Sequence, residues 1–173
     1  MLEAVVRTLS ESRIDEIVVV LGHNSELVRR KVVLGRARVV TNKDYDKGLG
    51  SSIKVGIESL HSDSKAVVLA LADQPLVSVA TINALVLGYL ETGGPVVAPY
   101  FRGRRGNPLL FDHKLFPYLK KIQGDRGAKM VIKELGWKVV RVNVKDPGVI
   151  QDIDVEEDYD RALAELSEDI SEH

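Results

Sequence analysis

Runs of apolar residues alternate with amphipathic stretches along almost the whole chain. Residues 16–21 and 66–72 are apolar runs of strand length, rich in valine, leucine and alanine. In the stretches between such runs, apolar residues recur at every third or fourth position, as on the buried face of a helix. Runs without internal alternation are typical of strands covered on both faces. The pattern predicts an α/β domain with a mostly parallel sheet between layers of helices.

In the first half of the chain, strands and helices are predicted to alternate regularly. We expect strands at 16–21, 37–40 and 66–72, and helices at the N-terminus, at 24–30, at 51–60 and from Pro75 onward. Asn24 is expected to cap the second of these helices, and Gly35 to end it. In the fourth helix one face is predicted to carry Ile82, Leu85, Val86, Tyr89 and Leu90.

The second half is predicted to be less regular. Residues 95–100 and 108–111 are expected to form a hairpin around a basic tip at 102–106. Helices are expected at 113–122 and 128–135, a strand at 138–144, and a last helix from Asp154, where Glu157 completes a capping box. We predict a single domain over residues 1–166 and a frayed tail at 167–173.

Composition narrows the function classes. The 24 basic and 25 acidic residues give a net charge of −1, which argues against a dedicated nucleic-acid binder. The chain has no cysteine, which excludes disulfides, thiol catalysis and cysteine zinc sites. It has no apolar run of membrane-spanning length, and its N-terminus lacks the pattern of a secretory signal. We therefore expect a cytoplasmic globular protein that does not bind nucleic acid or membranes.

Carboxylates follow two of the predicted strands. Ligands bind outside the carboxyl ends of strands in sheets of this kind, so these residues are candidates. Asp73 ends the most apolar run, where its carboxylate could hold a divalent cation or simply begin the turn before Pro75. Asp152 and Asp154 follow another apolar run, and Asp154 is also explained as a helix cap. A shared Mg²⁺ would require the fold to bring Asp73 together with one of them.

Three further segments are candidates for binding. The loop 48–52 offers backbone N–H groups and two hydroxyls at a helix N-terminus, which suit an anion or a nucleotide base, although capping and turn formation explain it as well. Arg102, Arg104 and Arg105 could hold a phosphorylated substrate or be solvated surface charge. For Asp125 and Arg126 the same two alternatives, substrate binding and solvated surface charge, stay open.

Together, five motifs resemble those of the MobA-like nucleotidyltransferases, and most closely the molybdenum cofactor cytidylyltransferase (MocA-like) branch. In chain order they lie at 20–23, 42–52, 72–75, 103–108 and 152–154, and the segments 124–128 and 146–148 extend the likeness. The resemblance implies a Rossmann-like three-layer α/β sandwich of the nucleotide-diphospho-sugar transferase type. It also implies transfer of a nucleoside monophosphate, from CTP or GTP, to a phosphorylated acceptor such as molybdopterin or molybdenum cofactor, with release of pyrophosphate.

The resemblance also assigns roles to residues. Mg²⁺ is the implied cofactor, held by Asp73 with Asp152 or Asp154, and these are the implied catalytic residues. The implied nucleotide-binding residues are Asn42, Gly48, Gly50, Ser51, Ser52 and Asp73. The implied acceptor-binding residues are Arg104, Arg105, Asn107, Asp125 and Arg126. A molybdoenzyme is a further implied partner.

The chain departs from the family at its start. The family begins with a strand and a glycine-rich loop that holds the triphosphate, ahead of the helix with which this chain starts. Without that strand we expect a gap between neighbouring strands and weak or absent activity. This departure has three explanations. The natural protein is longer, a second chain supplies the strand, or catalysis has been lost. The alternative functions are sugar-phosphate nucleotidyl transfer and a non-catalytic module that binds and delivers a cofactor.

Overall fold

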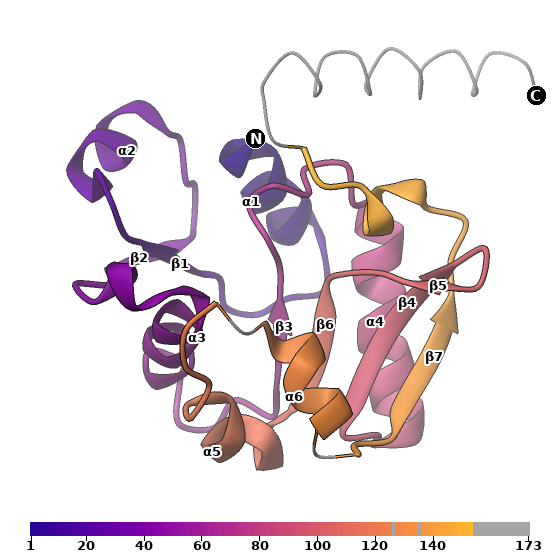
Figure 1. Ribbon diagram of the computed structural model, residues 1–173. Helices are drawn as coiled ribbons and strands as arrows, with labels where there is room; N and C mark the ends of the chain where they lie inside the picture. The colour runs from indigo at the N-terminus through magenta and orange to yellow at the C-terminus, as the bar shows by residue number, and fades with distance from the viewer. Residues whose placement is uncertain (126, 135, 154–173) are drawn as a thin grey trace, which may run out of the picture.

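The computed structural model describes residues 1–125, 127–134 and 136–153 (Figure 1). The strands are β1 (Val18–Leu21), β2 (Arg38–Thr41), β3 (Ala66–Leu69), β4 (Val96–Phe101), β5 (Arg104–Arg105), β6 (Leu109–Asp112) and β7 (Val139–Asn143). The helices are α1 (Leu2–Glu11), α2 (Ser25–Lys31), α3 (Leu49–Glu58), α4 (Val79–Thr92), α5 (Phe116–Leu119) and α6 (Ala128–Glu134). Short 3-10 turns are η1 (Tyr45–Lys47), η2 (His113–Leu115) and η3 (Pro147–Ile150).

The strands form two sheets. In the smaller, β1 and β2 pair in parallel, with Val19 opposite Val39. In the larger, β6 pairs antiparallel with both β3 and β4, β7 pairs in parallel with β4, and the short β5 folds back on the end of β4. Because β3 and β4 both oppose β6, they run in the same direction as each other and as β7. The predicted α/β class is confirmed, with a mixed sheet in which β5 and β6 run against the rest.

The two sheets are separate in the described part of the chain, where β1 pairs only with β2 and β3 only with β6. The resemblance predicts a break between neighbouring strands, and in the described residues the strands are divided between two sheets, β1 and β2 in one and β3 to β7 in the other. The two sheets therefore contribute to one fold through helices and loops rather than through a shared ladder of backbone hydrogen bonds.

Helices cover both faces of the larger sheet. Val96 and Ala98 of β4 and Phe111 of β6 pack in a core with residues of α3, α5 and α6. The alternate residues, Val97 of β4 and Leu110 of β6, pack against α4 on the opposite face (Figure 1). Successive side chains of a strand point to opposite faces, so an unbroken apolar run serves both cores. This is the predicted three-layer arrangement.

Helix α1 covers the smaller sheet. Its Val6 is buried in a cluster with Ile17, Val19 and Leu21, and Leu2 and Leu9 pack against the same cluster. The helix also contacts α4, which links the small sheet to the large one. The predicted N-terminal amphipathic helix is therefore present and buries its apolar stripe.

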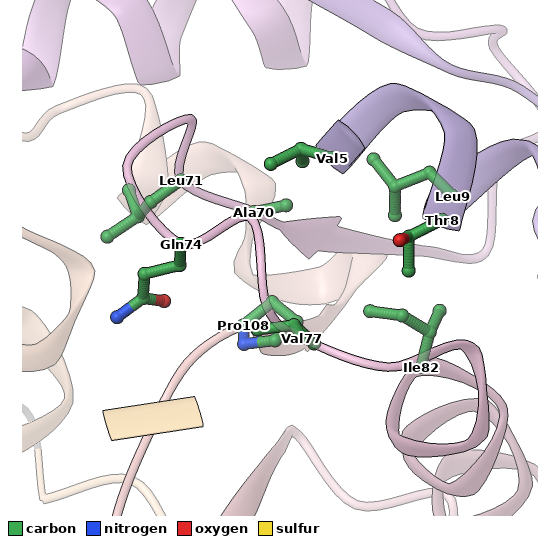
Figure 2. Close-up of a pocket in the computed structure, with 9 residues that line it drawn as sticks. All are labelled: Val5, Thr8, Leu9, Ala70, Leu71, Gln74, Val77, Ile82 and Pro108. Atoms are coloured by element: carbon green, nitrogen blue, oxygen red, sulfur yellow. The ribbon is translucent and has the colours of Figure 1, made fainter. Parts of the chain in front are cut away.

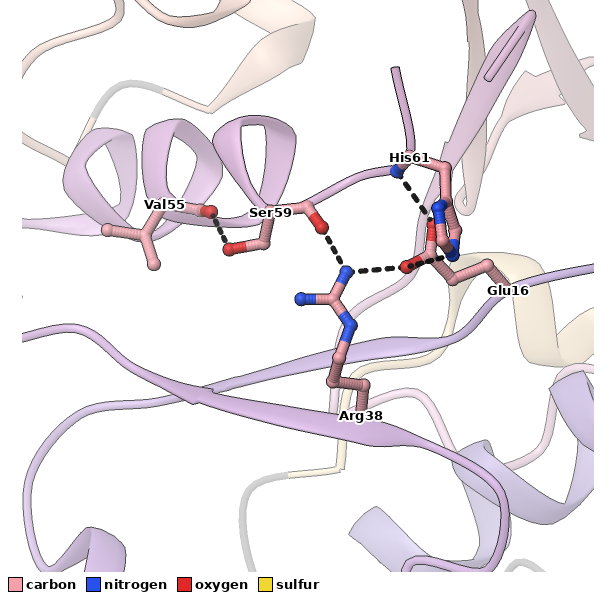
Figure 3. Close-up of polar contacts among 5 residues, drawn as sticks. All are labelled: Glu16, Arg38, Val55, Ser59 and His61. Carbon is pink, nitrogen blue, oxygen red and sulfur yellow. Dashed lines mark hydrogen bonds and ion pairs between the residues drawn. The ribbon is translucent and has the colours of Figure 1, made fainter. Parts of the chain in front are cut away.

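A polar cluster ties the small sheet to the end of α3 (Figure 3). Arg38 of β2 donates to Oε1 of Glu16 at 2.5 Å and to the carbonyl oxygen of Ser59. The backbone N–H of His61 donates to Oε2 of Glu16 at 3.1 Å. Burial alone would raise the pKa of Glu16, but the hydrogen bonds from Arg38 and from the His61 backbone, with the positive charges of both side chains, lower it overall.

Several predicted details are wrong. Strand β3 ends at Leu69 rather than at residue 72, because β6 pairs with only Ala66–Leu69 and the chain then turns. Asn24 precedes α2 in a left-handed conformation (φ 53°) and its side chain makes no capping hydrogen bond. Leu90 of α4 is 71% exposed, because it lies one position, and so about 100° around the helix, beyond the packed Tyr89.

Other predicted details are confirmed or lie outside the described residues. The hairpin around the basic tip is present, since Val96 pairs with Phe111 and Val97 with Leu110. The predicted helix over 113–122 is divided into η2 and α5. The capping box at Asp154, the last helix and the tail at 167–173 lie outside the described residues. In the described part of the chain, no helix combines the length and the apolar character needed to cross a membrane.

Candidate functional site

The segments that carry Asp73 and Asp152 lie side by side. After β3 the chain turns through Asp73, whose side chain is exposed, and its carbonyl oxygen accepts the N–H of Ile153 at 2.7 Å. Ile153 is buried. Since Asp152 directly precedes Ile153, the two predicted carboxylates come from adjacent segments at the end of β3.

A second hydrogen bond joins the same two segments. Nε2 of Gln74 donates to Oδ1 of Asp152 at 2.5 Å. Gln74 is only 4% exposed, whereas Asp152 is exposed. A buried amide therefore contacts a carboxylate that otherwise faces solvent. Sequence analysis missed this contact, although Gln74 lies inside the 72–75 motif.

The path of the chain toward Asp152 is fixed by Asp146. Its Oδ2 accepts hydrogen bonds from the N–H and the hydroxyl of Ser78, both at 2.8 Å, and from the hydroxyl of Thr81 at 2.6 Å. Its Oδ1 accepts the N–H of Gly148 at 3.0 Å. A Cβ at Gly148 would lie 2.6 Å from the carbonyl carbon of Leu76, so glycine permits η3 to pack against the chain that precedes α4. The feature of the sequence that points to these contacts is the Asp-Pro-Gly motif at 146–148.

The basic tip ends at the same place. The N–H of Asn107 donates to the carbonyl oxygen of Val149 in η3 at 2.8 Å, and a Cβ at Gly106 would lie 2.3 Å from that oxygen. Asn107 is buried, while Arg104 is exposed and Arg105 partly buried in β5. The predicted motifs at 72–75 and 103–108, and residues 152 and 153 of the third motif, therefore meet around η3.

The predicted nucleotide residues form a second group. Asn42 is 1% exposed, and its Nδ2 donates to the hydroxyls of Ser51 at 2.8 Å and of Ser52 at 3.0 Å. Its Oδ1 accepts the N–H of Asp44 at 2.9 Å. The amide of Asn42 is thus occupied within the protein, and its observed role is to hold the end of β2 against the start of α3.

The two glycines of this loop allow a close contact with residues 122–125. A Cβ at Gly50 would lie 2.5 Å from the carbonyl oxygen of Ile122, and the N–H of Gly50 donates to the carbonyl of Gly124 at 2.9 Å. Gly48 has φ +88°, and a Cβ there would lie 2.6 Å from Oδ1 of Asp125. Asp125, predicted to face the acceptor, therefore lies against the predicted nucleotide loop. Arg126 and Asp154 lie outside the described residues.

Two other pairs of side chains lie near this loop. Nδ1 of His23 is 3.4 Å from the hydroxyl of Tyr45 in η1, and the two rings are 5.7 Å apart between centroids. The hydrogen bond and the charge of Lys47 lower the pKa of Asp44, which is exposed. Both pairs involve the polar turn between β2 and α3.

The chemistry of the donors fits a cation that is shared with a substrate. Asp73 and Asp152 offer hard carboxylate oxygens, and Mg²⁺ is commonly bound through one or two carboxylates, water and substrate phosphates. Among the described residues there is no cluster of three or more metal-ligating side chains. The described site therefore suits a metal–phosphate complex better than a cage made of protein ligands alone.

A small apolar cavity lies behind Gln74, between α1 and the turn after β3 (Figure 2). Its lining includes Val5 and Leu9 of α1, Leu71, Val77 and Pro108. Its volume of about 10 Å³ is no more than one water molecule needs. The cavity is therefore too small to be a substrate pocket, and the candidate site consists of the exposed Asp73 and Asp152 beside it.

Comparison with known structures identifies the fold as that of nucleotidyltransferases. The chain superposes on a nucleotidyl transferase from Methanothermobacter thermautotroptrophicus with a TM-score of 0.77, 26% identity and coverage of 93% of this chain and 77% of that one. It superposes on Rv0371c of Mycobacterium tuberculosis, in a complex with manganese, with a TM-score of 0.79, 25% identity and coverage of 92% and 83%.

Residues 1–140 match the MobA-like NTP transferase domain, and the chain belongs to this family. Nicotine blue oxidoreductase from Paenarthrobacter nicotinovorans is 31% identical over 86% of this chain and 75% of its own length. Purine catabolism protein PucB from Bacillus subtilis is 36% identical over 72% of this chain and 60% of its own length. The resemblance that the motifs predict is thereby confirmed.

Proposed function

We propose that the protein transfers a nucleoside monophosphate from a nucleoside triphosphate to a phosphorylated small molecule, with release of pyrophosphate. The observation that carries the proposal is the meeting of the motifs at 72–75 and 103–108 with residues 152 and 153 around η3. Membership of the MobA-like NTP transferase family supports the class of reaction.

In this reaction a phosphate oxygen of the acceptor attacks the α-phosphorus of the triphosphate. The new O–P bond forms as the bond from the α-phosphorus to the bridging oxygen breaks, and pyrophosphate leaves with the electron pair. Catalysis of this kind depends on positioning and on stabilising negative charge, so it needs no covalent nucleophile. A bound Mg²⁺ supplies charge neutralisation along the phosphates.

We assign Asp73 and Asp152 to holding the cation, since their segments are joined by two hydrogen bonds. The loop 48–52 is assigned to the base and ribose, with Asn42 holding the loop from behind. Arg104 and Arg105 are assigned to the phosphate of the acceptor, because their hairpin ends at Asn107 beside η3. Asp125 is assigned to the boundary between nucleotide and acceptor, since it adjoins Gly48.

For the substrates we propose CTP and molybdopterin or molybdenum cofactor, on the motif resemblance to the MocA-like branch. GTP is the alternative nucleotide, and a sugar phosphate the alternative acceptor. A role in the cytoplasm, with a molybdoenzyme as partner, belongs to the same proposal.

Pyrophosphate release tests the proposal. The protein, with any upstream segment that its gene encodes, is incubated with Mg²⁺ and CTP or GTP, and with molybdopterin or a sugar phosphate. We expect turnover with CTP and molybdopterin. Release only with the sugar phosphate would reassign the acceptor, and release with no combination would refute nucleotidyl transfer. Because one relative is named an oxidoreductase, reduction of nicotine blue is measured alongside.

Substitution of Asp73 tests its role. Asp73→Asn removes the charge but keeps the size, and we expect turnover to fall about a hundredfold or more, because the phosphates lose a charged group that positions their cation. Asp63→Asn, the same change at an exposed position in the turn before β3, is the control and should leave turnover unchanged. Equal turnover by the Asp73 variant and the control would remove Asp73 from the site.

A further inference from the structure

The side-chain amide of Gln74 has one satisfied end and one unsatisfied end. Its Nε2 donates to Asp152, but its buried Oε1 has no hydrogen-bond partner in the described part of the chain. Figure 2 shows the amide beside the apolar cavity, with its oxygen on the side of Pro108 and Val77. An amide oxygen buried among apolar side chains is unfavourable, and such unpaired groups are rare in folded proteins.

The orientation of the amide has a physical reason. The two ends of an amide are nearly equal in size, so rotation by half a turn would fit the same space. That rotation would point the carbonyl oxygen at the carboxylate of Asp152 and create a repulsion between two acceptors. The observed orientation instead gives a charge-assisted hydrogen bond of 2.5 Å. The hydrogen bond to Asp152 therefore accounts for this orientation, although it leaves Oε1 without a hydrogen-bond partner among the described residues.

The contact also orients Asp152. Asp152 is exposed, and the bond from Gln74 to Oδ1 is the one hydrogen bond to its side chain from the described residues. Among the described residues, Oδ2 accepts no hydrogen bond. The backbone bond from Ile153 to Asp73 and the side-chain bond from Gln74 together hold the segment at two successive residues.

We propose that Gln74 is a positioning residue, which fixes the carboxylate of Asp152 beside the turn of Asp73 so that both can hold one divalent cation. The inference rests on the proposed function for the identity of that cation. The clamp itself, between a buried amide and the segment 152–153, is independent of any ligand and can be tested without one.

Amide hydrogen exchange in the metal-free protein tests the clamp. Gln74→Met keeps the length of the side chain and removes the amide. We expect the Ile153 N–H to exchange about tenfold faster or more in this variant, because a hydrogen bond to a charged group is lost. The Asn107 N–H, bonded to Val149, is the internal reference and should be unchanged. The matched control is Gln151→Met, at an exposed neighbouring position.

Binding of Mn²⁺ alone, measured from the electron paramagnetic resonance signal of the free ion, tests the consequence for the site. We expect affinity to fall severalfold in Gln74→Met and to stay constant in Gln151→Met. Either unchanged exchange at Ile153 or unchanged Mn²⁺ affinity in the folded Gln74 variant would overturn the proposal. If circular dichroism shows that Gln74→Met does not fold, Gln74→Asn, with an amide one methylene shorter, takes its place under the same criteria.

The two readouts separate this inference from the proposed function. If the unchanged protein binds no Mn²⁺, the cation site of the proposed function fails, whereas the exchange rate of Ile153 still decides whether Gln74 holds the segment. If Mn²⁺ binds and Gln74→Met changes neither readout, the cation site stands and the positioning role is wrong.

Discussion

At the scale of single residues, buried and half-buried polar side chains organise this protein more than exposed charges do. The buried Asn42 and Gln74 and the half-buried Asp146 each hold two segments together through hydrogen bonds to backbone or side-chain groups, and those of Gln74 and Asp146 join segments distant in sequence. Surface ion pairs such as Lys47–Asp44, both well exposed, contribute little by comparison. The placement of the site therefore depends on a few hydrogen-bonding groups that are buried or half-buried.

Glu16 gives a prediction about pH. Its pKa is lowered from 4.5 on folding, so its contribution to stability is fully present above about pH 4.5 and is lost as the pH falls through the lowered value. We expect Glu16→Gln to destabilise the protein at pH 7, and the difference in unfolding free energy from the unchanged protein to shrink below pH 4.5. Urea unfolding at pH 7, 5, 4 and 3 measures that difference.

Glu11→Gln is the matched control, since Glu11 is exposed at the end of α1. It should change the unfolding free energy little at any of these pH values. A difference for Glu16→Gln that stays constant from pH 7 to pH 3 would show that the contacts with Arg38 and His61 do not act through the charge of Glu16.

At the scale of elements, the contact between the start of α3 and residues 122–125 shapes the proposed nucleotide loop. Gly50 is helical, so alanine there would ordinarily favour the helix by about 1 kcal/mol. Its Cβ would, however, lie 2.5 Å from the carbonyl oxygen of Ile122. Backbone must therefore move, and we expect Gly50→Ala to destabilise the protein by about 1–3 kcal/mol.

Gly56→Ala in the same helix is the control. A Cβ there would meet only the end of the Val20 side chain, at 3.3 Å, and its effect should stay within about 1 kcal/mol. Chemical unfolding of the two variants makes the comparison. If Gly50→Ala is as stable as Gly56→Ala, the segments 48–52 and 122–125 are not in the close contact that the structure gives them.

The elements themselves were largely predictable, because they depend on local pattern. The alternation of apolar runs and amphipathic stretches predicted each described helix and all strands except the two-residue β5. The errors arose where tertiary contacts, rather than the local pattern, determine where a strand ends or which side chain is buried. The apolar run at 66–72 is longer than β3 because β6 offers partners for four residues only, and Leu90 is exposed although it is apolar.

The site was predictable only in part. The spacing of the motifs could not show that Asp73 and Asp152 meet, and only the family resemblance implied that their segments and that of Asn107 belong to one site. In the structure, Asp73 and Ile153 share a backbone hydrogen bond, and Asn107 bonds to Val149 of η3. The roles of Gln74 and Asp146 did not follow from the sequence, because they depend on which distant side chain or backbone group each one meets. Asn42 was expected along the nucleotide, yet its amide is occupied by Ser51, Ser52 and Asp44.

At the scale of the whole molecule, the break between the sheets divides the core. Among the described residues, the cluster around β1 and β2 holds four that are buried, against eleven in the cluster that joins β4 and β6 to α3, α5 and α6. The smaller unit has less buried apolar area to oppose its opening. We therefore expect it to open separately, at lower free energy than global unfolding.

Hydrogen exchange under native conditions tests this expectation. The amides of β1 and β2 should exchange faster than those of Val97 and Ala98 in β4, and only the β4 amides should reach the protection set by global unfolding. Equal protection in both sheets would mean that the contacts of α1 and the Glu16 cluster join the two parts into one cooperative unit.

The hydrogen bond between Gln74 and Asp152 joins residues 78 positions apart, and this separation has a consequence for synthesis. While the protein is being made, the turn of Asp73 leaves the ribosome long before Asp152 has even been added to the growing chain. The amide of Gln74 has no carboxylate to meet until that point. A chain released prematurely can thus contain nearly every strand of the fold and still lack one half of its candidate site.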